Sequence, residues 1–77
     1  MPKYNEALGA AIARLREAEG ISQEELAERA NIHRTYVSQL ERGLKSPTLS
    51  ILQRIAVALD VRASRIVRLA EDEPNGL

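Results

Sequence analysis

Hydrophobic residues recur along the chain three or four positions apart, which is the spacing of a helix that buries one face. In the first segment the apolar stripe consists of Leu8, Ile12, Leu15 and Ala18. In the fourth segment it consists of Leu49, Leu52, Ile55, Ala56 and Leu59. The pattern therefore predicts an all-α fold of five helices, over about Asn5–Glu19, Gln23–Ala30, Arg34–Arg42, Leu49–Leu59 and Ala63–Glu71.

Residues between these segments are typical of helix ends. Ser22 is a candidate N-cap, and Glu25 three residues later would complete a capping box. Thr48 takes the same N-cap place before the fourth helix. Asn31 follows the second helix, and Asn is the commonest residue other than glycine that adopts positive φ. We therefore expect a short second helix and a tight turn into the third.

The third segment has a polar face opposite its apolar one. At 100° per residue from Arg34, Val37 falls at about 300° and Leu40 at about 240°, so the core-facing side is centred near 270°. Glu41 lies on the flank, at about 340°. The side facing away from the core is polar and partly cationic, with no acid near its centre, and carries Arg34, Thr35, Ser38, Gln39 and Arg42.

Length and composition limit the class of protein. The 77 residues suffice for one domain, with an ordered part over about 5–71 and a frayed tail over 72–77. There is no cysteine, and His33 is the single histidine, so the chain lacks the ligands of a zinc site. The four glycines stand apart and form no phosphate-binding loop. We expect neither a catalytic site nor a metal or other cofactor.

The longest uninterrupted apolar run, Ile55–Leu59, is far shorter than the ~20 residues that a membrane helix needs. Residues 1–6 lack the apolar core of a signal peptide. Together with the absence of cysteine, these features predict a cytoplasmic protein with no membrane partner and no evident small-molecule ligand.

The net charge of zero conceals an uneven distribution. Residues 1–28 carry three basic and six acidic side chains, a net charge of −3. Residues 29–54 carry five basic side chains against Glu41, net +4, and residues 55–70 carry three against Asp60, net +2. Residues 71–73 are all acidic, net −3. A basic middle can attract phosphate even in a neutral chain, because the local patch decides, although ordinary solvated surface has the same composition.

Two short helices joined by a tight turn, the second with a polar outward face, form a helix-turn-helix. From about Leu8 to Leu69 the sequence closely resembles the Cro and lambda-repressor-like, or XRE, family of helix-turn-helix proteins. The residues that carry this resemblance are Ser22–Ala27, Ala30, Arg34–Ser38, Glu41–Gly43 and Pro47–Leu49. The run 34–38 and the small size are most similar to the controller proteins of restriction–modification systems. Phage or plasmid repressors and antitoxins of similar size also fit.

The resemblance implies a sequence-specific transcriptional regulator that binds double-stranded DNA. It implies a five-helix domain whose third helix lies in the major groove and which acts as a homodimer on a palindromic operator. By position, the resemblance assigns base reading to Arg34, Thr35, Ser38 and Gln39. It assigns phosphate contacts to Ser22, Gln23, Tyr36, Arg42, Lys45 and Ser46.

Several of these residues have structural alternatives. The ring of Tyr36 could pack against the domain, and Arg42 could serve the C-terminal end of its helix. His33 is better interpreted as a helix cap or a surface residue than as a base-reading residue or a metal ligand. In the family, the glutamate at Glu41 pairs with a basic residue late in the first helix, here Arg16, so we expect a scaffold ion pair.

The sequence departs from the family pattern at two positions. Asn31 stands where the family usually has glycine, and it can serve the same backbone role. Arg62 stands where the last helix is usually capped by serine, so we expect a weak cap there.

The fifth helix carries more apolar surface than one small bundle needs. We expect part of it, from Ile66, Val67 and Leu69, to form a dimer interface with a second copy. The alternative function is a protein-interaction or antitoxin-type module on the same fold. Such a module would carry an exposed apolar patch on the outward face of the third helix, whereas that face is polar.

Overall fold

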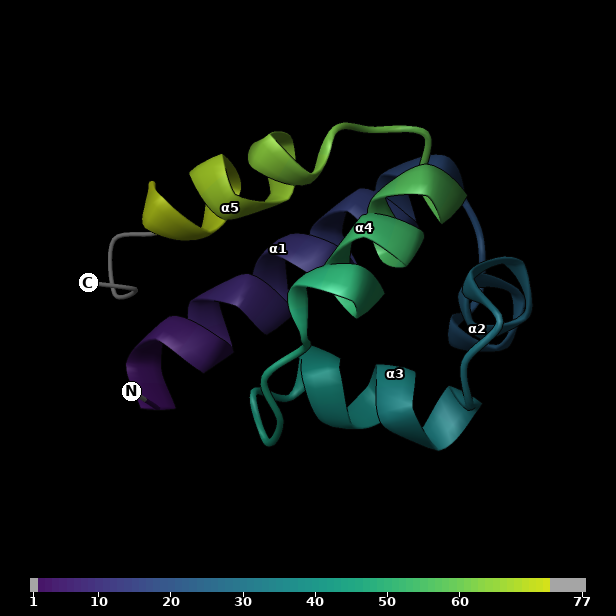
Figure 1. Ribbon diagram of the computed structural model, residues 1–77, viewed down its shortest axis with the longest axis horizontal. Helices are drawn as coiled ribbons and strands as arrows, with labels where there is room; N and C mark the ends of the chain where they lie inside the picture. The colour runs from purple at the N-terminus through teal and green to yellow at the C-terminus, as the bar shows by residue number, and fades with distance from the viewer. Residues whose placement is uncertain (1, 73–77) are drawn as a thin grey trace.

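The computed structural model describes residues 2–72 of the chain, and residue 1 and residues 73–77 lie outside the described part. Five helices follow one another in this part (Figure 1): α1 (Pro2–Glu19), α2 (Gln23–Ala30), α3 (Arg34–Glu41), α4 (Leu49–Ala58) and α5 (Ala63–Glu71). The predicted all-α, five-helix fold is therefore confirmed. Of the predicted frayed tail, only Asp72 falls within the described residues, where it is the C-cap of α5.

Helix boundaries differ from the predicted ones in three places. α1 begins at Pro2 rather than near Asn5, since proline is well tolerated in the first turn of a helix. α3 and α4 each end one residue early, because Arg42 and Leu59 are their C-caps. These shifts leave the order and the connections of the helices unchanged.

The predicted caps form, with one correction. The Ser22 hydroxyl accepts a hydrogen bond from the Glu25 backbone N–H at 3.0 Å, and Thr48 caps α4 in the same way. The side chain of Glu25 does not complete the capping box, because its carboxylate accepts a hydrogen bond from Arg29 at 2.7 Å instead. Asn31 adopts φ 58°, as expected for the left-handed end of α2. Arg62 precedes α5 without a side-chain cap, which confirms the expected weak start.

The core is aliphatic and draws side chains from all five helices. Its largest fully buried members are Ile12, Leu26, Val37, Leu40, Ile55, Leu59 and Ile66. Two predictions about the core are wrong. Ala18 is exposed at the end of α1, and the alanines of this helix that contribute to the core are Ala7 and Ala11. Leu49 is 75% exposed, because it opens α4 at a position that no described residue covers.

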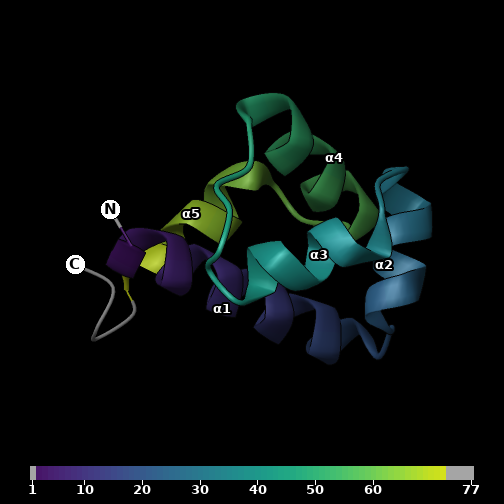
Figure 2. The same ribbon diagram turned by 90° about the horizontal axis from the view of Figure 1, so that it is seen from below.

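α1 lies between α3 and α5 and contacts both of them (Figures 1 and 2). α2 packs against α3 and α4, and α4 closes against α5. The approach of α1 to α3 depends on Gly9, since a Cβ atom at this position would collide with the carbonyl oxygens of Leu40 and Glu41. The missing side chain lets the two helix backbones touch, which fixes the depth at which α3 sits on the bundle.

The described helices include none that is long and apolar enough to cross a membrane. Within residues 2–72, no three or more His, Cys, Asp or Glu side chains gather in a way that could hold a metal ion.

Candidate nucleic-acid interface

α3 separates a buried face from a solvent-facing one, as its pattern predicts. Val37 and Leu40 are almost fully buried. On the opposite side Arg34, Thr35 and Arg42 are exposed, while Ser38 and Gln39 are half-buried. The five polar side chains assigned to this face are thus all at least partly open to solvent.

The turn between α2 and α3 is held by backbone geometry and by an arginine of α4. The Ile32 N–H donates to the Ala27 carbonyl at 2.9 Å, and the left-handed conformation of Asn31 directs the chain into α3. Arg54 then donates to the carbonyls of Ala30 and Asn31, at 3.1 and 2.5 Å. These carbonyls lie at the end of α2, where the helix dipole favours a cation.

The role of Arg54 was missed by the sequence analysis. Its contacts join residues 23 and 24 positions apart in the chain, and no pattern within one helix signals such a pairing. The two bonds from Arg54, which we call the Arg54 clamp, nevertheless anchor the turn that orients α3. Arg29 makes a similar connection to the Ala58 carbonyl, at 3.4 Å.

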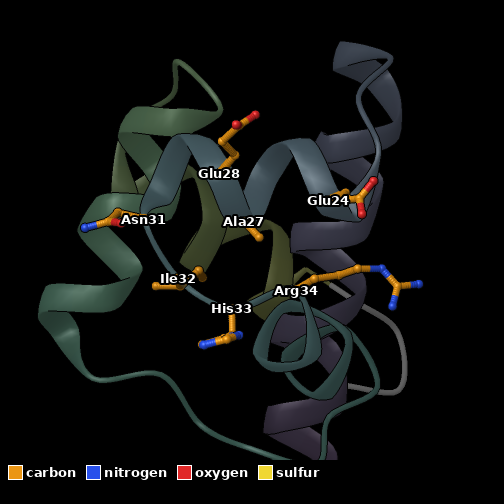
Figure 3. A pocket seen from close by; sticks show the side chains of 7 residues that line it. All are labelled: Glu24, Ala27, Glu28, Asn31, Ile32, His33 and Arg34. Atoms are coloured by element: carbon orange, nitrogen blue, oxygen red, sulfur yellow. The ribbon is translucent and has the colours of Figure 1, made fainter.

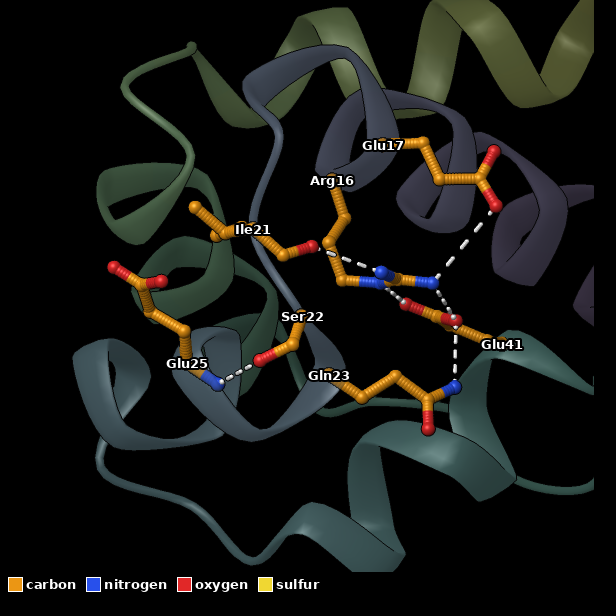
Figure 4. Close-up of polar contacts among 7 residues, drawn as sticks. All are labelled: Arg16, Glu17, Ile21, Ser22, Gln23, Glu25 and Glu41. Atoms are coloured by element: carbon orange, nitrogen blue, oxygen red, sulfur yellow. Dashed lines mark hydrogen bonds and ion pairs between the residues drawn. The ribbon is translucent and has the colours of Figure 1, made fainter.

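A nearly buried carboxylate joins α1, α2 and α3 (Figure 4). The Glu41 side chain is 6% exposed and that of Arg16 is 14% exposed. Arg16 donates to both Glu41 oxygens, from Nε at 2.6 Å and from Nη2 at 3.1 Å. Gln23 Nε2 donates to Glu41 Oε1 at 2.9 Å. The expected scaffold ion pair is confirmed, and it also holds Gln23, which the sequence analysis had not foreseen.

Arg16 is engaged on all sides of its guanidinium. Besides the two bonds to Glu41, Nη1 donates to the Ile21 carbonyl at 2.9 Å, and Glu17 lies 4.0 Å away. The hydrogen bond to Glu41 raises the pKa of Arg16 above its ordinary value, while partial burial acts in the opposite direction. The charge of Arg16 therefore persists at every pH that the fold survives, and the pair remains intact on the arginine side.

The candidate phosphate-binding residues surround α3. Ser22 and Gln23 open α2, whose first backbone N–H groups favour an anion. Lys45 and Ser46 are exposed in the loop that follows α3. Tyr36 is half-buried and packs against the core, which agrees with the structural alternative for its ring.

A surface depression of about 370 Å³ lies between α2 and the start of α3 (Figure 3). Glu24 and Glu28 line it together with His33 and Arg34, and Arg34 extends outward on the side of Glu24. His33 is exposed and, as the N-cap of α3, makes no side-chain capping bond. With two carboxylates in its lining, this depression does not suit a phosphate.

The surface of α5 corrects one of the predicted interface residues. Ile66 is fully buried in the core of its own chain, so it has no surface to offer a second copy. Val67 and Leu69 are half-buried. They lie two residues apart, hence about 160° apart around the helix, so a single contact surface would use one of them. The large apolar side chains most exposed to solvent lie elsewhere, at Leu44, Leu49 and Val57.

Known proteins that are similar to this chain share its helix-turn-helix. The helix-turn-helix family model matches residues 12–66. The HTH-type transcriptional regulator y4dJ of Sinorhizobium fredii, itself uncharacterised, is 38% identical over 69 residues, which cover 90% of each chain. This chain spans about half the length of several other curated regulators that it matches.

Solved structures of regulators have the same fold. The restriction–modification controller protein C.AhdI from Aeromonas hydrophila superposes with a TM-score of 0.80 at 34% identity, over 80% of this chain and 94% of that one. The clp gene regulator ClgR from Corynebacterium glutamicum gives a TM-score of 0.88 at 31% identity, over 96% and 92% of the two chains.

We predict that Glu41→Gln destabilises the fold, because Arg16 loses its charged partner in a nearly buried place. The expected loss is about 1–3 kcal/mol of unfolding free energy, which in a domain of this size lowers Tm by about 4–8 °C for each kcal/mol. Thermal unfolding followed by circular dichroism measures it.

Glu17→Gln is the matched control, since the Glu17 side chain is 70% exposed and lies 4.0 Å from the same arginine. It should change stability by no more than about 0.5 kcal/mol. If Glu41→Gln is equally harmless and instead strengthens DNA binding, Glu41 is a surface charge near phosphate and not a scaffold group.

Proposed function

The chain belongs to the XRE-type helix-turn-helix family, and on that premise we propose that it is a sequence-specific DNA-binding regulator of transcription that acts as a homodimer on a palindromic operator. The observation that carries this proposal is the outward face of α3. Its cations, Arg34 and Arg42, have no side-chain partner among the described residues, whereas Arg16, Arg29 and Arg54 are all bonded to the scaffold.

The face of α3 has the side chains for reading bases in a major groove. A guanidinium such as that of Arg34 can bond guanine O6 and N7 together, and an amide such as that of Gln39 can pair with adenine N6 and N7. The methyl group of Thr35 can meet that of thymine. Ser38 is small enough to permit close approach or to bond either kind of base.

The groups around this face would hold the sugar–phosphate backbone and set the register of α3. Glu41 accepts one N–H of the Gln23 amide and so holds this side chain at the first turn of α2, beside the free backbone N–H groups. Lys45, Ser46 and Arg42 follow at the other end of α3. Contacts of this kind position a protein without reading sequence.

An interaction module on the same fold is less well supported. Such a module would need an exposed apolar surface on α3, and the large exposed hydrophobic side chains of the described residues lie in the following loop and on α4. An enzymatic function has no set of catalytic residues in the sequence to support it. With DNA as its partner, the protein would work in the cytoplasm, and its similarity to C.AhdI makes a role as a controller protein the first to test.

The homodimer is proposed because two α3 helices must reach successive major grooves, about 34 Å apart, whereas one chain extends only 30 Å along its longest axis. A two-fold contact between copies uses the same patch twice. Val67 is the better candidate on α5, because Leu69 lies close to Arg65 around the helix. In a contact through Leu69, the Arg65 side chains of the two copies would repel each other. Around α5 Val67 lies about 40° from Ala63, on the flank away from Arg65.

The first prediction distinguishes a side chain that contacts bases from one that contacts phosphates. Arg34→Ala should cost ~1–3 kcal/mol on the cognate duplex and relax the preference at one base pair of each half-site, because a bidentate contact to one base is lost. Lys45→Ala should weaken cognate and scrambled duplexes equally and lower the salt slope by about one unit for each lost phosphate contact. Binding curves at several salt concentrations on both duplexes measure these effects.

An equal loss on both duplexes for Arg34→Ala would make Arg34 a phosphate contact and contradict its reading role. A loss of base preference in Lys45→Ala would place that side chain at the bases.

The second prediction concerns self-association. Val67→Asp should shift the protein from dimer to monomer at micromolar concentration and weaken operator binding at the same time, because a charge replaces apolar surface at the interface. Sedimentation velocity gives the oligomeric state, and circular dichroism checks the fold.

Leu49→Asp and Val57→Asp introduce the same charge at two exposed positions of α4 and should leave the dimer intact. A dimer lost in these variants and kept in Val67→Asp would move the interface from α5 to α4. Wild-type protein that remains monomeric at this concentration would contradict the proposed homodimer.

A further inference from the structure

Arginine side chains without a partner gather at two separate places in the described part of the chain. Arg34 is the first residue of α3, and Arg42 is its C-cap. The remaining three lie at α5, where Arg62, Arg65 and Arg68 are exposed and make no side-chain hydrogen bond or ion pair within residues 2–72. The arginines that support the fold are all bonded, so this second group has no structural task that the described residues show.

We call Arg62, Ser64, Arg65 and Arg68 the arginine face. These four residues line a single depression of about 300 Å³. On α5, Arg65 and Arg68 point away from the stripe of Ile66 and Ala70, which is fully buried. From Arg62 to Arg68 the chain rises about 9 Å, so three like charges are held in a short row.

Such a row costs electrostatic free energy in the free protein, and a bound polyanion would relieve it. Glu71 and Asp72 lie three and four positions after Arg68, and neither forms an ion pair with it. The first turn of α5 also lacks a side-chain cap: the Arg65 N–H donates to the Arg62 carbonyl, and no capping side chain accepts from the N–H groups of Ala63 and Ser64.

The arginine face cannot share the duplex that α3 would bind. α1 and α4 lie between α5 and α3, which occupy opposite sides of the molecule (Figures 1 and 2). The molecule measures 22 Å along the direction that separates the two helices in Figure 1. A straight duplex bound by α3 therefore lies on the far side of the molecule and does not reach the outer side of α5.

We propose that the arginine face binds the phosphate backbone of a second DNA duplex, so that the protein bridges two DNA segments. This inference rests on the proposed function, which places α3 on the first duplex. Guanidinium groups match phosphate oxygens with two parallel bonds. A row of about 9 Å lies opposite two or three phosphates of one strand, which are spaced about 3.4 Å apart along the axis.

DNA is favoured over an acidic protein because the contact through α3 tethers the protein to a long DNA molecule, and other segments of that molecule are then present at high local concentration. None of the four residues of the arginine face is apolar, and the described hydrophobic residues most open to solvent, Leu44, Leu49 and Val57, lie outside it, so the face has no exposed apolar anchor for a protein partner.

A bead assay tests the bridge. Beads carrying a biotinylated 30-base-pair duplex are coated with the protein and washed, and a fluorescent duplex of the same length is added at low salt. Wild-type protein should retain the fluorescent duplex. The triple variant Arg62→Gln, Arg65→Gln, Arg68→Gln should bind the bead duplex within about twofold of wild type and retain at least about tenfold less of the second duplex, since about three phosphate contacts are lost.

Two further variants sharpen the result. Lys3→Gln removes an exposed charge from α1 and should retain the second duplex as wild type does. Arg65→Lys keeps the charge and removes the planar guanidinium, so retention of the second duplex should fall less than in Arg65→Gln. The monomeric variant Val67→Asp, coated onto the beads to the same level as wild type by using a higher protein concentration, should still retain the second duplex. This result separates the bridge from one made by two α3 helices of a dimer.

The outcomes are distinct. Wild-type protein that fails to coat the bead duplex contradicts the proposed function itself. Wild-type protein that coats the beads and retains no second duplex, or a triple variant that retains as much as wild type, overturns this inference alone. Equal competition by polyglutamate of the same total charge would also overturn it, because the face would then take an acidic polypeptide and not a duplex.

Discussion

The Glu41 carboxylate must be satisfied in a place where little water reaches it, and the arrangement of the first three helices follows from that requirement. Arg16 donates to both of its oxygens from α1, and Gln23 donates from the first turn of α2. Because Glu41 is the last residue of α3, one side chain fixes this helix against the other two. A buried charge without partners would cost far more than any single surface contact gains.

Opposite ends of α3 are held by different means. Its C-terminal end is tied to α1 by the carboxylate and by the close approach at Gly9. Its N-terminal end follows the left-handed Asn31, whose carbonyl is clamped by Arg54 of α4. With both ends set by the scaffold, the outward side chains of α3 are free to serve a partner, and a rigid support of this kind is what precise recognition needs. No buried side-chain polar atom among the described residues lacks a hydrogen-bond partner.

The local features of the fold could be predicted from the sequence, because they depend on residues a few positions apart. The caps at Ser22 and Thr48, the left-handed Asn31 and the buried stripe of Val37 and Leu40 are of this kind. Predictions that depend on contacts between distant segments were wrong or absent. Leu49 fits the helical stripe but is exposed to solvent, and Ile66 is fully buried in the core. The bonds of Arg54 to the turn and of Gln23 to Glu41 join distant segments, so no periodic pattern in the sequence signals them. The Arg16–Glu41 pair was expected only through the family resemblance.

In the proposed complex the outward face of α3 enters DNA while the scaffold behind it stays fixed. Backbone amide NMR of ¹⁵N-labelled protein, titrated with a duplex, measures which residues the DNA contacts. We expect the largest chemical-shift changes at residues 34–42, at 22–23 and in the loop at 45–46, with small changes along the exposed side of α4. Changes concentrated on α4, around Leu49 and Val57, with α3 unaffected, would contradict it.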